Sequence, residues 1–557
     1  MSIPKSILLA SSLIALLAAC GADQAAPSSE IRVTLTPNSA SVYVTQSVQF
    51  TATVHNSTNS AVTWSLSGAG CSGDACGRIS SSGLYTAPPN VPYPAAVKVK
   101  ATSVADTSKS ASATITILAT VNMWTWVSGS NSRGQVGVYG TKDVADPANV
   151  PGARSLAVSW LDSNGNLWLF GGGGVDSAGN YGELNDLWKY DPQTSMWTWI
   201  SGSNVIAQNG IYGTKGTPHS ANVPGARSMA ASWLDSSGDL WLFGGIGYDS
   251  TGDYGWLNDL WRLNPATLEW TWVSGADAVF QVGVYGTKGI ADPANVPGAR
   301  DRASSCRDSS GNFWLFGGEG IDSTGEYCDL NDLWRFDPTT LEWTWISGSN
   351  MAYQAGVYGA KGTADPANVP GGREMPVLQI DSGGNLWLFG GAGLDSVGYP
   401  GSLNDLWKYD PATLQWTWIS GSNTAYQAGV YGTKGTADPA NVPGARSGVV
   451  CWIDPLDKLW LFGGQGLATP GDSGDLNDLW RYDPTTSAWT WVSGSNTAYQ
   501  SGVYGIKGTA DSSNVPGARS GAVSWLDASG NLWLFGGSGI DSAGQQGDLN
   551  DLWRYTR

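Results

Sequence analysis

The stretch LNDLWRYTR, Leu549 to Arg557, is the last of six copies of one phrase. The earlier copies continue where this one ends, as in LNDLWKYDPQTSMWTW from Leu184, which runs through an Asp-Pro turn into a second tryptophan-rich phrase. The phrase recurs every 73 residues without insertion or deletion, at Leu184, Leu257, Leu330, Leu403, Leu476 and Leu549. A repeat of fixed period is typical of solenoids and propellers, so the repeat is the first guide to the fold.

Each copy predicts four short strands. In the first copy they are SLAVSWLD (155 to 162), LWLFGG (167 to 172), DLWKYD (186 to 191) and WTWI (197 to 200). Short β-rich runs separated by Gly, Asn-Gly and Asp-Pro are typical of strands and turns, and the copies sustain no helical period. Four-stranded units repeated radially form a β-propeller. We therefore predict an all-β chain with a six-bladed propeller.

The sixth copy lacks the fourth strand of the pattern. One spare phrase, MWTWVSG from Met123, precedes the first complete copy. If this phrase pairs beside Asp551 to Tyr555, backbone hydrogen bonds join the first and last parts of the ring and no sheet edge is left open. We therefore expect an N-terminal strand to close the ring.

The order of motifs within a copy resembles the kelch repeat of galactose-oxidase-type propellers. An Arg-led strand is followed by an aliphatic run ending in Gly-Gly, then by LNDLW, Tyr-Asp and a closing Trp. The resemblance covers roughly residues 121 to 557, and we assign the propeller to residues 119 to 557. Because the kelch period is about 50 residues, the longer copies here indicate extended loops.

The chain begins with a segment of another kind. Residues 1 to 20 combine Lys5, an apolar run from Ile7 to Ala19 and the sequence LAAC, which ends at Cys20. They resemble a secretory signal peptide with the lipobox of bacterial lipoproteins. The resemblance implies export, acylation of the Cys20 thiol and anchoring to a bacterial membrane, at the outer membrane or the cell surface. Residues 21 to 29 are a linker.

Residues 30 to 118 alternate apolar and polar side chains in runs such as VQFTATV and SASATITI. This pattern predicts a small β-sandwich, and the phrases VTWS and GLYTAPP resemble bacterial immunoglobulin-like modules. We expect this domain to act as a spacer between the lipid and the propeller. Cys71 and Cys76 are expected to form a disulfide in an oxidising compartment.

Composition limits the classes of function. Residues 119 to 557 hold 23 basic and 42 acidic side chains, so the net charge of the chain, −17, resides in the predicted propeller. A domain of this sign repels phosphate backbones, which argues against nucleic acid as a partner. The propeller holds one histidine, His219, whereas the copper site of galactose oxidase uses several. We therefore predict no copper-radical activity, no His-based triad, no metal and no cofactor.

Loop lengths distinguish the two faces of the predicted ring. Successive strands of a blade are antiparallel, so the long connections 171 to 185 and 201 to 226 emerge on one face and the short turns on the other. Loops on a rigid scaffold commonly carry binding groups. We therefore predict that the face with the long connections is the functional surface.

Two repeated residue types are candidates on this face. The arginine that opens each first strand pairs either with the Asp of the LND phrase or with an anionic ligand, and the tyrosine of each GVYG or GIYG phrase either contacts a ligand or fixes its loop. The arginines are Arg154, Arg227, Arg300, Arg373, Arg446 and Arg519, and the tyrosines are Tyr139, Tyr212, Tyr285, Tyr358, Tyr431 and Tyr504.

The sequence thus favours a non-catalytic binding protein at the bacterial cell surface, with a protein or a glycan as ligand. The alternative is a carbohydrate-active enzyme, a polysaccharide hydrolase or lyase with its site on the same face. An enzyme needs one singular site, whereas near-identical loops favour a repeated recognition surface. The segments RDRASSCRD (300 to 308) and REMPVLQID (373 to 381) depart most from the consensus and are where a singular site is expected.

Overall fold

The computed structural model describes residues 30–44, 46–68, 71, 73–88, 91, 95–118 and 122–556. The chain divides into two compact units after residue 120. The predicted signal peptide, Cys20 and the linker lie outside the described residues. The structure is all-β apart from one short 3-10 helix, η1 (Gly73–Cys76). Within the ranges given, no helix is long and apolar enough to cross a membrane.

The first unit consists of three small sheets around one hydrophobic core. The strand orders are β1 (Arg32–Thr36) with β4 (Thr51–His55); β2 (Ser39–Tyr43), β9 (Ser110–Leu118), β8 (Ala96–Ser103), β5 (Val62–Ser67); and β3 (Ser47–Gln49), β7 (Leu84–Thr86), β6 (Arg78–Ile79). Phe50, Val97 and Ile115 are completely buried in this core. The alternating apolar residues of the sequence therefore form the inner faces of these sheets.

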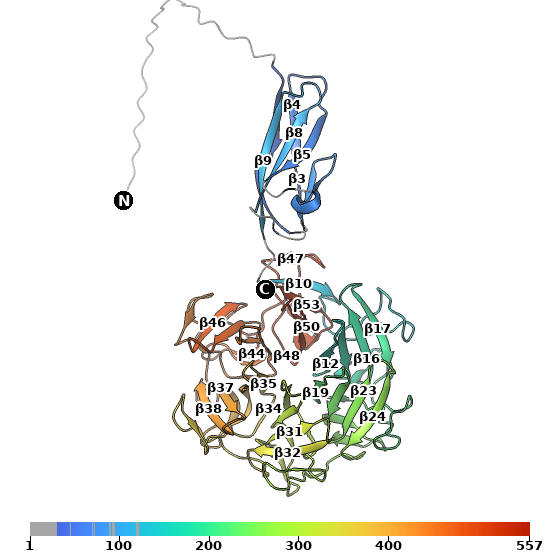
Figure 1. Ribbon diagram of the computed structural model, residues 1–557, viewed down its shortest axis with the longest axis vertical. Helices are drawn as coiled ribbons and strands as arrows, with labels where there is room; N and C mark the ends of the chain where they lie inside the picture. The colour runs from blue at the N-terminus through green and yellow to red at the C-terminus, as the bar shows by residue number, and fades with distance from the viewer. Residues whose placement is uncertain are drawn as a thin grey trace, which may run out of the picture. The chain divides into compact units, whose positions relative to one another are not determined.

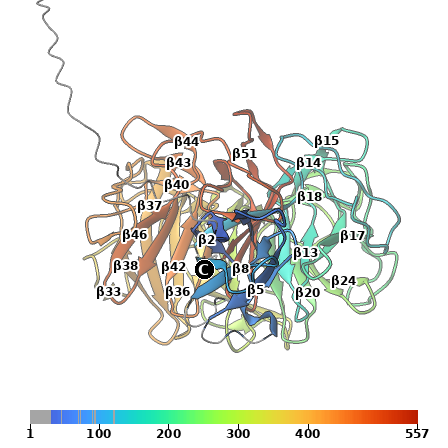
Figure 2. The same cartoon turned by 90° about the horizontal axis from the view of Figure 1, so that it is seen from above.

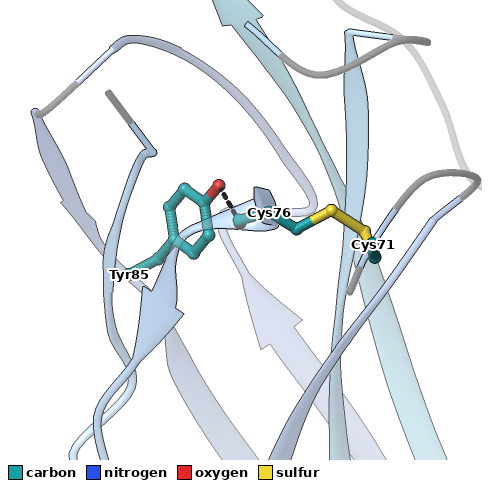
Figure 3. Close-up of a disulfide and its surroundings, with 3 residues drawn as sticks. All are labelled: Cys71, Cys76 and Tyr85. Atoms are coloured by element: carbon teal, nitrogen blue, oxygen red, sulfur yellow. Dashed lines mark hydrogen bonds between the residues drawn. A yellow bond between two sulfur atoms is a disulfide. The ribbon is translucent and has the colours of Figure 1, made fainter. Parts of the chain in front are cut away.

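A disulfide joins Cys71 to Cys76 at helix η1 (Figure 3). Beside it, the hydroxyl of the buried Tyr85 donates to the Cys76 carbonyl oxygen at 2.7 Å. Burial raises the pKa of Tyr85 to about 12, so this hydroxyl keeps its proton. Helix η1 is thus tied to the core by a covalent bond and by a hydrogen bond.

The second unit is a β-propeller (Figure 1). In its first sheet the strand order, from the axis outward, is β12 (Val158–Leu161), β13 (Leu167–Phe170), β16 (Leu187–Asp191) and β17 (Met196–Ser201). Every residue of β13 is buried, as expected for an apolar strand that is covered on both faces. We call the six sheets of this kind blades 1 to 6, in chain order.

The other blades repeat this arrangement with the register preserved. Blade 2 has β19 (Ala231–Leu234), β20 (Leu240–Phe243), β23 (Leu260–Asn264) and β24 (Glu269–Ser274); blade 3 has β27 (Ser304–Arg307), β28 (Phe313–Phe316), β31 (Leu333–Asp337) and β32 (Glu342–Ser347); blade 4 has β35 (Val377–Ile380), β36 (Leu386–Leu394), β37 (Pro400–Asp410) and β38 (Gln415–Ser420); blade 5 has β41 (Val450–Ile453), β42 (Leu459–Phe462), β45 (Leu479–Asp483) and β46 (Ala488–Ser493); blade 6 has β49 (Val523–Leu526), β50 (Leu532–Phe535), β53 (Leu552–Thr556) and β10 (Met123–Ser128).

Strand β10 closes the ring, as predicted from the sequence. It pairs antiparallel with β53, with Trp124 opposite Tyr555 and Thr125 opposite Arg554, and takes the place of the fourth strand of blade 6. Trp124 is 2% exposed, and its ring centroid lies 5.2 Å from that of Phe462 and 5.0 Å from that of Tyr555. The N-terminal strand therefore joins blade 6 through both backbone pairing and core packing.

The first predicted strand of each copy is interrupted at its second residue, which is a correction to the four-strand pattern. In blade 1, Leu156 has a φ of 59° and separates β11 (Arg154–Ser155) from β12. Strand β11 leaves the blade and pairs with β14 (Gly173–Val175), which pairs with β15 (Tyr181–Glu183). The first long connection, 171 to 185, is therefore a hairpin. These strands were not predicted from the sequence, because the connection is rich in glycine.

These small sheets, which we call the upper sheets, lie on one side of the ring (Figure 2). Blade 4 forms the same pairs with continuous strands, because β34 (Arg373–Glu374) pairs with β36. The others are β18 (Arg227–Ser228), β21 (Ile246–Tyr248), β22 (Tyr254–Trp256); β26 (Arg300–Asp301), β29 (Glu319–Ile321), β30 (Tyr327–Asp329); β40 (Arg446–Ser447), β43 (Gln465–Leu467), β44 (Ser473–Asp475); and β48 (Arg519–Ser520), β51 (Ser538–Ile540), β52 (Gln546–Asp548).

The second long connection of each copy runs along the outer edge of the following blade. Strand β25 (Ala291–Asp292) pairs with the outer strand β32, and Lys288 lies 4.2 Å from the Trp345 ring centroid while its ammonium donates to the Gly348 carbonyl oxygen at 2.7 Å. Strands β33 (Ala364–Asp365), β39 (Ala437–Asp438) and β47 (Ala510–Asp511) cover blades 4 to 6 in the same way. Much of this connection therefore shields a sheet edge.

Candidate functional site

The six arginines that were candidates on the face with the long connections are buried inside the blades. Arg154 is 1% exposed, and its Nη1 and Nη2 donate to Asp186 Oδ1 and Oδ2 at 2.6 and 2.8 Å. Its Nε and Nη1 also donate to the carbonyl oxygens of Gly152 and Gly171. The same ion pair occurs at Arg227, Arg300, Arg373, Arg446 and Arg519.

The six tyrosines complete these ion pairs. Tyr139 is 5% exposed, and its hydroxyl donates to Asp186 Oδ2 at 2.6 Å, the oxygen that also accepts the Trp188 indole N–H at 2.7 Å. The equivalent hydroxyl contacts are made by Tyr212, Tyr285, Tyr358, Tyr431 and Tyr504.

The assignment of these twelve side chains to a ligand-binding surface is therefore corrected. Their polar groups are occupied by protein partners and are enclosed between strands, so they hold each long connection to its blade. Two interpretations were given for each residue type. In the structure the arginines form ion pairs with Asp, and the tyrosines fix their loops.

The axis of the propeller is closed by a ring of backbone hydrogen bonds at the residue that interrupts each first strand. The Leu156 N–H donates to the Gly521 carbonyl oxygen at 2.8 Å, and the Met229 N–H donates to that of Leu156 at 2.9 Å. The series continues around the ring through Leu156, Met229, Arg302, Met375, Gly448 and Gly521. All six have a positive φ, and they line a pocket of about 170 Å³ at the axis.

This axial pocket is not symmetric, because one of the six positions is charged. Arg302 is 28% exposed, and its Nη1 donates to Glu319 Oε2 at 2.5 Å and to Glu374 Oε2 at 2.6 Å. Its Nε lies 3.1 Å from the Met229 sulfur. The guanidinium therefore points from the axis toward the upper sheets of blades 3 and 4.

Four carboxyl groups gather around Arg302. Asp301 on β26 lies directly opposite Glu319 on β29, which lies directly opposite Asp329 on β30. Glu374, on β34 of blade 4, reaches the same guanidinium. We call Asp301, Glu319, Asp329 and Glu374 the acidic row. Like charges directly opposite one another in a sheet are destabilising, so this arrangement needs an explanation.

Among the six upper sheets, this composition occurs once. The position of Asp301 is occupied elsewhere by Ser155, Ser228, Glu374, Ser447 and Ser520, and that of Glu319 by Gly173, Ile246, Ala392, Gln465 and Ser538. A carboxylate in another upper sheet has hydrogen-bond donors as neighbours. Asp475 of blade 5 accepts from Ser520 Oγ at 3.0 Å and from Gln546 Nε2 at 3.2 Å. Asp329 is the residue of blade 3 that is equivalent to Asp475, and Glu374 is equivalent to Ser520. Asp329 therefore has a carboxylate as its neighbour where Asp475 has a hydroxyl donor.

Burial and mutual repulsion raise the pKa values of three members of the acidic row, Asp301, Glu319 and Asp329. Asp301 is 1% exposed, and burial, with the charges of Glu319 and Glu374, raises its pKa to about 7 although the Arg302 guanidinium opposes the shift. Burial and the same two glutamates raise the pKa of Asp329 to about 7. Burial and Glu374 also raise the pKa of Glu319. Carboxyl groups perturbed in this way are candidates for a functional site.

A second feature of this side of the ring is a set of exposed aromatic side chains. Tyr181, Tyr254 and Tyr327 begin outer strands of upper sheets, and Tyr399 precedes β37. Phe280, Tyr353, Tyr426 and Tyr499 lie in the first third of the second long connections. Within the described residues these eight are the aromatic side chains classed as exposed. We call them the exposed aromatics.

Several of the exposed aromatics lie in groups with other aromatic rings. The Trp256 ring centroid lies 5.8 Å from that of Phe280 and 5.6 Å from that of Tyr327, and those of Tyr399 and Tyr426 are 6.3 Å apart. A pocket of about 320 Å³ between Tyr426 and Tyr499 is also lined by polar residues, among them Gln465, Ser473 and Ser402. The sequence analysis missed these tyrosines, because they lie in the loops where the copies differ.

Comparison with known proteins finds similarity only in solved structures. The chain matches no family model and no curated protein. It is similar to the structure of YjhT, with 15% sequence identity, coverage of 74% of this chain and 95% of that chain, and a TM-score of 0.42. It is also similar to a protein of unknown function from Bacteroides thetaiotaomicron, with 10% identity, coverage of 96% and 99%, and a TM-score of 0.41.

Proposed function

We propose that this protein is a non-catalytic binding protein of the bacterial cell surface, and that its kelch-type propeller presents the side with the upper sheets to a protein or glycan ligand. The observation that carries the proposal is the distribution of the exposed aromatics, all of which lie on the hairpins or connections of this side. Tyrosine supplies a large, rigid contact area at a low entropic cost, and it is enriched where binding energy concentrates.

One part of this surface is the pocket between Tyr426 and Tyr499. Two aromatic rings flank it, and the side chains of Gln465, Ser402 and Ser473 line it. Aromatic walls with a few polar groups are the usual composition of a specific ligand site. This composition suits a sugar ring or a polar peptide segment.

The remaining parts of the proposal concern placement. Acylation of Cys20 would hold the chain at a membrane, and two or more acyl chains give stable anchoring. The first unit, as an immunoglobulin-like spacer, would separate the propeller from the lipid surface.

A carbohydrate-active enzyme is the second candidate, and the acidic row favours it. A hydrolase or lyase needs a singular set of carboxyl groups with shifted pKa values, and Asp301, Glu319 and Asp329 of the acidic row meet that description. The hydrogen bonds of Arg302 to Glu319 and Glu374 weigh against it, because a catalytic carboxyl group must be free to exchange a proton.

The test is a glycan and protein array probed with the full chain and with a Tyr426→Ala, Tyr499→Ala double variant. Alanine fits this backbone, because Ala207 occupies the equivalent position with a φ of 60°. We expect the double variant to lose binding, whereas Leu456→Ala, at a 70% exposed residue in a short turn of blade 5, should bind like the wild type. Equal binding by all three proteins would refute the assignment. Release of new reducing ends from a bound polysaccharide would favour the enzyme.

A further inference from the structure

We propose that the acidic row is a binding site for an organic cation, namely the ammonium or guanidinium group of a ligand. This inference goes beyond the aromatic surface and does not depend on it. The four carboxyl groups of the row surround one cation, the Arg302 guanidinium. The row therefore has more hydrogen-bond acceptors than this one guanidinium can supply with donors. A second cation would correct that imbalance.

The buried member of the row is the strongest sign that a partner is missing. Asp301 is 1% exposed, and neither carboxylate oxygen has a hydrogen bond of ordinary distance and angle; a donor nearby, the Trp256 side chain, lowers the pKa of Asp301 only against the larger effect of burial. Its ion-pair contact is a long one, 3.9 Å from Oδ2 to Arg302 Nε. A buried carboxylate without a hydrogen bond is costly, and four of the other blades avoid the cost with serine at this position. The departure therefore indicates a role that serine does not fill.

The two glutamates give the ligand access to the row. The side chains of Glu319 and Glu374 are 30% and 25% exposed, and both contact Arg302, which lines the axial pocket. Because both glutamate side chains are partly exposed, a cation from the solvent reaches them directly. Asp301 lies opposite Glu319 and attracts the cation electrostatically without contacting it. This attraction is strong because the surroundings of Asp301 have a low dielectric constant.

The neighbourhood suits an organic cation better than a metal ion. The described residues include no group of three or more His, Cys, Asp or Glu side chains arranged to hold a metal ion. Trp256 occupies in blade 2 the position that Asp329 occupies in blade 3, and its ring centroid lies 5.6 Å from that of Tyr327. Aromatic faces next to carboxylates are typical of sites for alkylated ammonium and guanidinium groups.

The repeat supplies matched variants. Asp301→Ser and Glu374→Ser introduce the residue found at the equivalent position in blades 1, 2, 5 and 6, and Arg302→Met introduces the residue found in blades 2 and 4, where Met229 and Met375 hold the same positive φ. Each change is therefore compatible with the local backbone. The two serine variants remove negative charge, whereas Arg302→Met removes the internal cation, so the proposal predicts effects of opposite sign.

The experiment is calorimetric titration of the full chain with trilysine, with a glucosamine oligosaccharide and with its N-acetylated counterpart. We expect wild type to bind at least one of the two amines and not the N-acetylated sugar. Asp301→Ser and Glu374→Ser should each weaken that binding about tenfold or more, which is about 1.4 kcal/mol, and Arg302→Met should strengthen it. Whether trilysine or the amino sugar binds more tightly distinguishes a peptide source of the cation from a glycan source.

Three outcomes would overturn the proposal: no binding of either amine by wild type, equal binding by the serine variants, or binding of calcium chloride that both serine variants abolish, which would assign the row to a metal. Circular dichroism of each variant confirms folding before titration. The Tyr426→Ala, Tyr499→Ala variant should bind the amine like wild type, so failure of the aromatic surface and failure of the cation site are separate results.

Discussion

Replacing Asp478 by asparagine in blade 5 tests whether the Arg–Asp pairs stabilise the fold or serve a ligand. The Asp478 carboxylate accepts Nη1 and Nη2 of Arg446 at 2.6 and 2.8 Å, the Tyr431 hydroxyl at 2.7 Å and the Trp480 indole N–H at 2.7 Å. The pair is completely buried. Blade 5 is chosen because it contains neither strand β10 nor the acidic row.

The size of the effect follows from this geometry. Asparagine leaves Arg446 charged and buried without its counter-ion, and breaking a buried ion pair by removal of one partner costs about 3–5 kcal/mol. Tyr431→Phe removes one hydrogen bond to a charged acceptor, which is worth about 1.5–3 kcal/mol. We therefore expect both variants to fold, with Asp478→Asn the less stable of the two.

Urea unfolding followed by tryptophan fluorescence measures the free energy of unfolding of each variant. A double variant, Arg446→Met with Asp478→Leu, provides the matched control, because replacing both charges by apolar side chains leaves no unpaired charge in the core. It should be more stable than Asp478→Asn alone. If Asp478→Asn unfolds like wild type and instead loses binding to a ligand found on the array, the arginines serve recognition and our structural assignment fails.

The other predictions concern the anchor, the ring closure and the acidic row. Cys20→Ser should abolish acylation and release the protein from membranes in a high-salt wash; equal retention of both forms would contradict the lipid anchor. Deleting residues 1 to 130 should destabilise the propeller much more than deleting residues 1 to 118, because only the longer deletion removes Trp124 and exposes the edge of β53; equal melting temperatures would contradict closure by β10. The pKa of Asp301 is raised from 3.8 to about 7 in the folded protein. Its ionised form therefore lowers the free energy of unfolding by up to about 4 kcal/mol above about pH 7, whereas the protonated form costs little below about pH 4. Asp301→Ser should therefore be more stable than wild type in urea at about pH 8 and similar to it at about pH 4; a difference independent of pH would contradict the shift.

The ring and its closure could be predicted because they depend on periodicity. Six copies of LNDLW and one spare WTW phrase suffice to predict the repeated sheet and the pairing of Met123–Ser128 with the last strand. The break at Leu156 could not be predicted, because leucine rarely adopts a positive φ. Gly448 and Gly521 at equivalent positions are the only hint in the sequence that this backbone is unusual.

The candidate site was predictable in location but not in composition. The segments 300 to 308 and 373 to 381 depart from the consensus, and they contribute Asp301, Arg302 and Glu374. Glu319 and Asp329 come from the connection that the sequence analysis assigned to a loop. Their place beside Asp301 depends on the register of β26, β29 and β30, which a glycine-rich sequence does not reveal.

The contrast between the repeated and the unrepeated polar groups indicates where function resides. The Arg–Asp–Tyr contacts recur in every blade with nearly the same distances, so each copy has the same local task, which is to hold a long connection. The backbone pairing of Asp301 with Glu319 is the same as that of Ser155 with Gly173 or Ser520 with Ser538. The blade scaffold therefore accepts either serine or a carboxyl group here, and it does not require the acidic row. The row opposes folding through burial and repulsion that the single Arg302 guanidinium only partly offsets, and the cationic ligand that we propose would supply a further force of the right sign.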